Sequence, residues 1–317
     1  MGWTAADIPT QRNRTVVVTG ANSGIGLETS RELARNGATV IMACRDSDRG
    51  EAAAQDVQAD VPDATLRVEK CDLARLESIH AFADRLGDEL VDVLINNAGT
   101  MAIPRGETDD GFETQFGVNH LGHFSLTGLV LEHLRTDGSK PARVVTVSSA
   151  LHERGEIEFD DLQSERDYDR WAAYSQSKLA NVCFAYELER RFRAGNVDAM
   201  SVAVHPGYAD TQLQFRGVDG RGTWARTAAR KLMNTVLAQS AERGALPTLY
   251  AATAPAVDGG GYYGPGGLMN MRGSPERQAS SDRSYDRETA RRLWAVSSEL
   301  TGVSYDLPEP TPAEPSS

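Results

Sequence analysis

Short apolar runs rich in β-branched residues alternate along the chain with longer stretches whose apolar residues recur at helical spacing. We expect six of the runs to be strands, at 15–19, 38–44, 65–71, 91–97, 142–148 and 200–207. We expect helices between them, at 26–37, 47–60, 76–87, 111–134 and 170–193. Buried parallel strands read as continuous apolar runs, and strand–helix alternation builds a parallel sheet with helices on both faces. The pattern therefore predicts a single α/β domain with a doubly wound, Rossmann-type parallel sheet.

The alternation breaks after the sixth strand, where residues 208–240 form the least regular part of the chain. We interpret this segment as a substrate lid, because it carries large apolar side chains at Leu213, Phe215, Trp224, Leu232, Met233 and Leu237. A further helix at 240–253 and a short strand within 259–267 are expected after it. Residues 304–317 have little apolar content and are expected to be disordered, so that the domain spans residues 1–303.

Composition and charge exclude several classes of protein. The 317 residues carry a formal net charge of -12, which disfavours nucleic acid and anionic lipid as partners, because both bind basic surfaces. No stretch approaches the roughly 20 apolar residues of a membrane-spanning helix. Because the N-terminus also lacks the apolar core of a signal peptide, we expect a cytoplasmic protein without a membrane anchor. Abundant Asp and Glu with only four lysines fit a halophilic source, where salt screens self-repulsion, a GC-rich genome, or both.

The residues that most often bind metals do not form a metal-binding pattern. Cys44, Cys71 and Cys183 are far apart and include no Cys-x-x-Cys pair, so we expect three small buried side chains. His120 and His123 lie three residues apart on a predicted helix, but no third ligand follows at a recognisable spacing. The sequence therefore predicts no metal site and no disulfide framework.

The first predicted strand runs into Thr19-Gly20-Ala21-Asn22-Ser23-Gly24-Ile25-Gly26, where a helix begins at once. Glycines at such a turn let the backbone approach a pyrophosphate, which then lies at the positive N-terminus of the helix. We therefore interpret this loop as a dinucleotide-binding loop, with contacts from Gly20, Asn22, Ser23, Gly24, Ile25 and Gly26.

The Thr-Gly-x-x-x-Gly-x-Gly spacing of this loop resembles that of the short-chain dehydrogenase/reductase family. The resemblance extends over nearly the whole chain through Asp72-Leu73, Asn96-Asn97-Ala98-Gly99, Asn119, Ser149, Tyr174-x-x-x-Lys178 and His205-Pro206-Gly207 with Thr211. Residues 161–181 are most similar to retinol dehydrogenases and WW-domain-containing oxidoreductases. The resemblance implies an oxidoreductase that moves hydride between a nicotinamide dinucleotide and an alcohol, aldehyde or ketone.

The resemblance also implies roles for individual residues. Ser149 would hydrogen-bond the substrate oxygen beside Tyr174, while Asn119 would position a water against Lys178 in a proton relay. Further cofactor contacts are implied at Asp72, Leu73, Asn97, Ala98, Gly99, Tyr174, Lys178, Pro206, Gly207 and Thr211.

Tyr174 and Lys178 have a spacing that suits proton transfer. Reduction of a carbonyl needs a hydride on carbon and a proton on oxygen, and free tyrosine titrates only near pH ~10. Lys178 lies one helical turn after Tyr174, and a cation there favours the phenolate. We therefore expect Lys178 to lower the pKa of Tyr174 toward the working pH.

The end of the second predicted strand indicates which cofactor is preferred. An NAD site places a carboxylate there for the ribose hydroxyls, but this strand ends in Cys44. Arg45 follows and can form charge-assisted bonds to a 2′-phosphate, which predicts NADP(H). A shift of one residue would instead bring Asp46 to the ribose and favour NAD(H).

Other readings of the sequence remain open. A dinucleotide-binding sensor without turnover is one, and a same-fold enzyme for epimerisation or double-bond reduction is another. The predicted lid favours a bulky apolar, retinol-like substrate. We expect a homodimer or homotetramer that associates through helices 111–134 and 170–193. Phe184, Leu188 and Phe192 offer an apolar stripe there, although burial on the sheet explains the stripe equally well.

Overall fold

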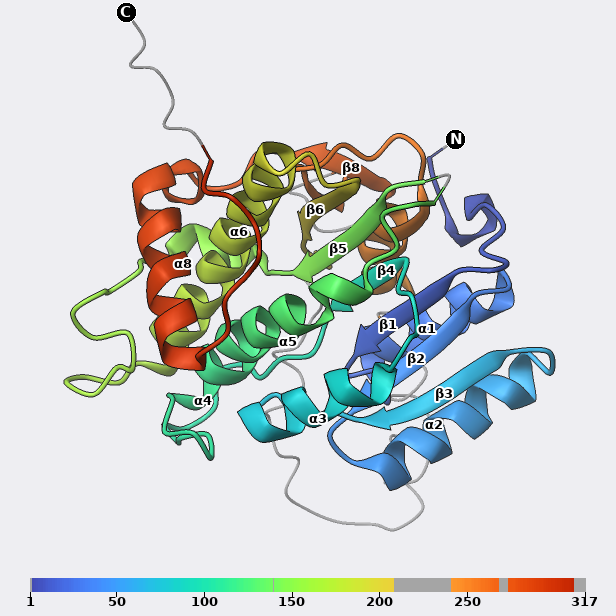
Figure 1. Ribbon diagram of the computed structural model, residues 1–317, viewed down its shortest axis with the longest axis horizontal. Helices are drawn as coiled ribbons and strands as arrows, with labels where there is room; N and C mark the ends of the chain where they lie inside the picture. Colours follow the sequence, from blue (N-terminus) through green and yellow to red (C-terminus); the bar gives the residue numbers. More distant parts are fainter. Residues whose placement is uncertain (1, 139, 208–240, 268–272, 311–317) are drawn as a thin grey trace, which may run out of the picture.

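The computed structural model describes residues 2–138, 140–207, 241–267 and 273–310 (Figure 1). Its centre is an eight-stranded sheet in the order β3-β2-β1-β4-β5-β6-β7-β8. The strands are β1 (Thr15–Thr19), β2 (Thr39–Cys44), β3 (Thr65–Lys70), β4 (Val93–Asn96), β5 (Ala142–Val147), β6 (Ala199–Val204), β7 (Tyr262–Pro265) and β8 (Pro275–Gln278). All neighbouring strands are parallel except β7 and β8. The predicted Rossmann-type sheet is therefore confirmed, with one antiparallel strand added at its edge.

Helices cover both faces of this sheet (Figure 1). The α-helices are α1 (Gly24–Arg35), α2 (Ser47–Asp60), α3 (Leu76–Leu86), α4 (Thr114–Phe116), α5 (Gly122–Val130), α6 (Arg170–Ala194) and α8 (Arg287–Thr301). Shorter helical turns are η1 (Ala5–Asp7), η2 (Gly117–Leu121), η3 (Leu131–His133), η4 (Ala150–Arg154) and η7 (Asp282–Tyr285). Residues 241–253 are also helical.

Two apolar cores lie on opposite faces of the sheet because successive side chains of a strand alternate between its faces. Val16 and Val18 of β1 pack in one core with Leu33 of α1. Val17, between them, packs in the other core with Phe82 of α3. Burial on both faces explains why these strands read as continuous apolar runs in the sequence.

The predicted helix at 111–134 begins later than expected and is not uniform. Gly111 has φ +85, outside the helical region, and the helix starts only after Glu113. The Glu113 side chain accepts hydrogen bonds from the backbone N–H groups of Gln115 and Phe116, which fixes that start. Residues 114–133 then pass from α4 through the π-helical turn η2 into α5 and the 3-10 turn η3.

The C-terminal part of the chain holds elements that the sequence pattern did not predict. Strand β8 and helix α8 both follow the last predicted strand. Residues 304–310 also differ from the expectation of a disordered tail. The Tyr305 hydroxyl donates to the Phe124 carbonyl at 2.6 Å, and the Tyr305 ring lies 4.4 Å from the ring of Trp294. Two partly buried side chains, Tyr305 and Leu307, pack this segment against the core although its average composition is polar.

The apolar stripe on α6 is buried within the chain itself. Phe184, Leu188 and Phe192 belong to the core between α6 and the sheet. Helix α8 packs along α6, as Figure 1 shows, and the ring of Trp294 lies 5.7 Å from that of Phe184. The stripe therefore does not provide the predicted seam between subunits, because the chain's own sheet and α8 cover it.

Several other expectations can be compared with the described residues. Cys44, Cys71 and Cys183 are buried free thiols, as predicted. No helix within the described ranges is both long and apolar enough to span a bilayer. The predicted lid at 208–240, with its six large apolar side chains and Thr211, lies outside the described residues.

Candidate active site

The carboxyl ends of the parallel strands gather the predicted site residues at one edge of the sheet. Strand order reverses between β1 and β4, and ligands of open α/β sheets bind at such switch points. Gly20 follows β1 and Asn97 follows β4, while Ser149 comes two residues after β5 and Pro206 two residues after β6. Chain segments that are far apart in the sequence therefore meet at this edge.

The hydroxyl groups of Ser149 and Tyr174 lie together. Ser149 is the N-cap of η4, and its Oγ accepts a hydrogen bond from Leu151 N at 3.2 Å. Tyr174 lies near the start of α6 and is 7% exposed, and the Ser149 side chain is near enough to its hydroxyl to oppose the effect of burial on its pKa. Asp169 caps this helix by accepting from the backbone N–H groups of Trp171 and Ala172, which fixes where the helix begins. The serine and tyrosine are thus placed to share one substrate oxygen.

Lys178 lies one turn further along α6 and is almost fully buried. Its Nζ donates to the Val147 carbonyl at 3.0 Å and lies 5.8 Å from the centroid of the Tyr174 ring. Burial lowers the pKa of Lys178 to about 8. Burial raises the pKa of Tyr174, and the hydrogen bond with Ser149 opposes this rise only in part.

The predicted lowering of the tyrosine pKa by Lys178 is therefore not found in the chain by itself. The ammonium group is engaged with Val147 rather than with the phenol oxygen, and burial of the ring disfavours the phenolate. The phenol stays protonated at neutral pH.

Asn119 lies in the π-helical turn η2 and is fully buried. Its Nδ2 donates to the Thr100 carbonyl and to Ser177 Oγ, both at 2.9 Å, and its Oδ1 accepts from Thr100 N at 2.8 Å. A methyl group added at Gly99 would lie 3.0 Å from Asn119 Oδ1 and 3.5 Å from Lys178 Nζ. The structure thus brings Asn119 and Lys178 together beside Gly99, where a larger residue would have its side chain, and π turns are frequent at functional sites.

Thr19, at the end of β1, has a role that the sequence did not reveal. Its Oγ1 accepts hydrogen bonds from Asn97 N at 2.9 Å and Ala98 N at 3.0 Å. It also contacts His123 Nε2 at 2.9 Å, while His123 Nδ1 contacts the Asn119 carbonyl at 3.0 Å. Thr19 and His123 therefore connect the glycine loop, the Asn97-Ala98-Gly99 segment and Asn119. The position of the threonine before the first glycine was the only signal for this role.

The glycine loop forms a cradle that suits a pyrophosphate. Gly20 has φ +64, and a methyl group added at Gly26 would clash with the Gly20 carbonyl. A methyl group at Gly24, by contrast, would meet nothing within 4 Å. Ser23 caps α1 without using its side chain, so the first turn of the helix is open to a ligand. Ile25 is partly buried on the same turn, and Asn22 precedes Ser23 at the rim. Open space at the N-terminus of α1 fits an anionic group.

Arg45 follows β2 and Asp72 follows β3, and both strands lie on the side of β1 that faces away from β4. Cys44 is fully buried, whereas Arg45 is exposed and has no hydrogen bond or ion pair within the described part of the chain. Asp46 is the N-cap of α2, and its Oδ1 accepts from Arg49 N at 3.1 Å. Asp72 accepts from Ala74 N at 3.1 Å, and Leu73 is buried beside it. The Asp46 carboxylate thus already caps a helix, while no residue of the described ranges pairs with the Arg45 guanidinium.

We expect Asp46→Ala to destabilise the fold by about 1 kcal/mol through loss of the α2 N-cap, without changing cofactor preference. Urea unfolding gives the first quantity, and the ratio of kcat/KM for NADPH and NADH gives the second. Asp46→Asn is the matched control, because asparagine caps helices as well as aspartate. A tenfold change of the ratio in Asp46→Asn, with stability unchanged, would show instead that the carboxylate contacts the ribose.

Pro206 and Gly207 form a turn directly after β6. Gly207 has φ +81, which a glycine adopts readily. A methyl group at Gly244 would lie 3.1 Å from Ile25 Cδ1 and 3.6 Å from Pro206 Cβ. The start of helix 241–253 therefore adjoins both the glycine loop and the Pro206 turn, whereas Thr211 lies outside the described residues.

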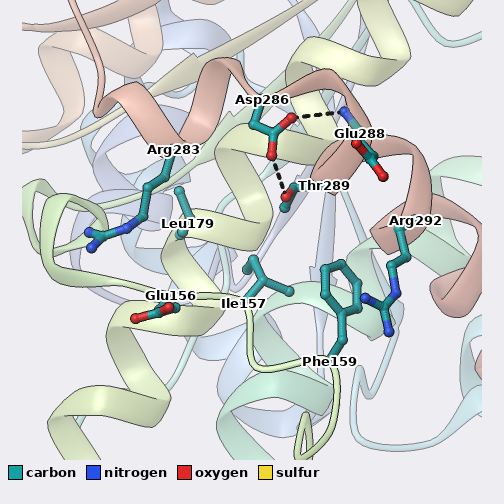
Figure 2. A pocket seen from close by; sticks show the side chains of 9 residues that line it. All are labelled: Glu156, Ile157, Phe159, Leu179, Arg283, Asp286, Glu288, Thr289 and Arg292. Carbon is teal, nitrogen blue, oxygen red and sulfur yellow. Dashed lines mark hydrogen bonds between the residues drawn. The ribbon is translucent and has the colours of Figure 1, made fainter.

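A cavity of about 290 Å³ lies elsewhere, between the loop around Ile157 and helix α8 (Figure 2). Figure 2 shows Phe159 on one side of it beneath Arg292, whose guanidinium lies 4.0 Å from the Phe159 ring centroid. Asp286, also drawn there, caps α8 and bonds to Thr289. This cavity contains none of the predicted site residues, so it does not carry the chemistry of the Ser149–Tyr174 cluster.

Comparison with known proteins identifies clear relatives. Residues 14–219 match the short chain dehydrogenase family. Human retinol dehydrogenase 13 is 44% identical over 92% of this chain and 85% of its own length. Mouse retinol dehydrogenase 12 is 42% identical over 92% of this chain and 88% of its own length. Among solved structures, an uncharacterized protein from Mycobacterium Paratuberculosis is 44% identical with a TM-score of 0.82, covering 97% of this chain and 100% of that one.

Proposed function

Because the chain belongs to the short-chain dehydrogenase family, and is therefore an NAD(P)-dependent oxidoreductase of alcohols and carbonyls, we propose three finer assignments. NADP(H) is the preferred cofactor, Tyr174 is the acid–base group, and the substrate is a bulky apolar alcohol, aldehyde or ketone. The observation that carries the proposal is the Ser149 side chain beside the buried Tyr174 hydroxyl, where it favours the phenolate, with Lys178 one helical turn away.

The bound nicotinamide dinucleotide supplies or accepts the hydride. The glycine loop and the N-terminus of α1 would hold its pyrophosphate, and Arg45 its 2′-phosphate. Pro206 and Gly207 lie at the same edge and would hold the nicotinamide half, while Asn97, Ala98 and Gly99 would border the adenine pocket. Asp72 and Leu73 would border the adenine.

Tyr174 donates the proton in the reducing direction. Its raised pKa keeps the phenol protonated at neutral pH, which is the form that a general acid needs. The proton goes to the carbonyl oxygen as the carbon receives the hydride, so that an alcohol forms and a phenolate remains. Ser149 holds the same oxygen by hydrogen bonding, and oxidation of an alcohol runs these steps in reverse.

Asn119 and Lys178 return the proton. The Lys178 ammonium stabilises the phenolate, and its own pKa of about 8 lets it exchange a proton near neutral pH. Asn119 holds its side chain beside Gly99, within reach of the same space, and would fix a water there. This relay connects Tyr174 to solvent in both directions of the reaction.

The two alternative readings are weaker. A sensor without turnover would not need Ser149 beside Tyr174, because the proposed role of Ser149 is to hold the substrate oxygen and not the cofactor. A same-fold enzyme for epimerisation or double-bond reduction would use similar side chains, so the identity of the product distinguishes it. A cytoplasmic location, a homo-oligomer and a halophilic source stay predictions from the sequence.

We expect retinal-like aldehydes to exceed small polar carbonyls by at least tenfold in kcat/KM with NADPH. Relatives at 42–44% identity are named retinol dehydrogenases, and the predicted apolar lid at 208–240 follows Gly207 directly in the sequence. Initial rates of NADPH oxidation over a panel of aldehydes and ketones measure this, with the alcohol product identified by chromatography. A tenfold advantage of small polar carbonyls, or a product other than the alcohol, would refute the substrate assignment.

A further inference from the structure

His152 is a buried histidine whose imidazole contacts the backbone of Ser149. It lies on η4, three residues after the serine, and is 1% exposed. Its Nδ1 lies 2.8 Å from the Ser149 carbonyl oxygen, and its backbone N–H donates to the same oxygen at 3.0 Å. Two groups of one residue therefore hold the backbone that carries the Ser149 hydroxyl.

The partners of His152 define its protonation state. Ser281 N donates to Nε2 at 3.0 Å, and because a backbone N–H can only donate, Nε2 must carry the lone pair. The proton of the neutral ring is therefore on Nδ1, where the Ser149 carbonyl accepts it. Burial also lowers the pKa of His152, so the ring stays neutral at working pH.

Aromatic rings from later parts of the chain pack around His152. The Tyr262 hydroxyl of β7 lies 3.2 Å from Nδ1, and the two ring centroids are 5.0 Å apart. The ring of His205 is stacked on Tyr262 at 5.2 Å, and a methyl group at Gly264 would clash with His205. These packed rings leave His152 little freedom to turn.

We propose that His152 is a positioning residue that directs the Ser149 hydroxyl toward Tyr174 through the Nδ1–H bond to the Ser149 carbonyl. This inference rests on the proposed function of Ser149. The segment around Ser281 holds the opposite nitrogen and thereby selects the tautomer that can donate. A displacement of a reacting group by about 1 Å can cost on the order of 100-fold in rate. Loss of the hydrogen bond from His152 Nδ1 to the Ser149 carbonyl is therefore expected to lower kcat.

Two substitutions of similar size distinguish the contributions of Nδ1 and Nε2 of His152. His152→Asn retains a donor near the position of Nδ1, whereas His152→Gln retains an acceptor near Nε2 but no donor to Ser149. We expect His152→Asn to keep kcat within about threefold of wild type, and His152→Gln to lower kcat by roughly 10- to 100-fold. The KM for NADPH should change less than twofold in both, and the melting temperature of each variant shows whether kcat merely follows stability.

The kcat of His152→Asn and of His152→Gln is then measured in a Ser149→Ala background. Because His152 acts through Ser149, His152→Gln should cost less than threefold more there. An undiminished cost in that background, or equal kcat for the Asn and Gln variants, would overturn the role of His152 and leave the proposed function intact. Wild-type kcat in Ser149→Ala alone would instead refute the proposed function of the serine.

Discussion

Tyr174→Phe is expected to lower kcat by roughly 10²- to 10⁴-fold while changing the Kd for NADPH by no more than a few-fold. The ring is buried and stays in place, so packing is retained, but the transferable proton is lost. General acid–base catalysis contributes this range of rate, equivalent to about 3–5 kcal/mol of transition-state stabilisation. Steady-state turnover with a retinal-like aldehyde gives kcat, and quenching of protein fluorescence by NADPH gives Kd.

Tyr263→Phe is the matched control for this loss. Tyr263 is also buried, and its hydroxyl accepts one hydrogen bond, from Asp258 N at 2.8 Å. Removal of that hydroxyl should lower stability without lowering kcat more than about twofold. If Tyr174→Phe kept more than about a tenth of the wild-type rate, the acid–base assignment would be wrong.

The second large effect concerns Arg45. Wild type should prefer NADPH over NADH by at least tenfold in kcat/KM, and Arg45→Ala should abolish most of that preference. The Arg45 guanidinium is exposed with no ion pair within the described residues, so it is available to a 2′-phosphate. The loss should appear in kcat/KM for NADPH, while the value for NADH should stay nearly constant, because only NADPH carries the phosphate.

Arg291→Ala on α8 controls for the loss of one surface charge. Arg291 is likewise exposed, but it lies outside the cluster of site residues. It should leave both cofactors unaffected. Equal use of NADPH and NADH by wild type would show that Arg45 does not bind the phosphate, and a rise in NADH use in Arg45→Ala would indicate a steric rather than an electrostatic role.

Local sequence determined the strands, the main helices and the order of the motifs. A buried strand leaves a short continuous apolar run and an amphipathic helix leaves a periodic pattern, so β1 and α2 could be predicted almost to the residue. The same holds for Tyr174 and Lys178, because a spacing of four on one helix places both on one face.

Tertiary structure decided what these residues contact. No local pattern shows that the Lys178 ammonium bonds to the Val147 carbonyl, 31 positions away, so the expected lowering of the pKa of Tyr174 was wrong for the chain by itself. The π-helical turn at Asn119 was likewise hidden, since its residues have the composition of an ordinary helix.

The longest-range features were the least visible in the sequence. Trp294 of α8 packs against Phe184 of α6, so the apolar stripe that we expected to lie between subunits belongs to an internal core. The backbone N–H of Ser281 donates to His152, which lies 129 positions earlier in the sequence. The spacing of apolar residues shows which face of a helix or strand is apolar, but it does not show which other part of the protein covers that face. Hydrogen bonding and desolvation depend on neighbours brought together by the sheet order, and these decide how Ser149, Tyr174 and Lys178 are held.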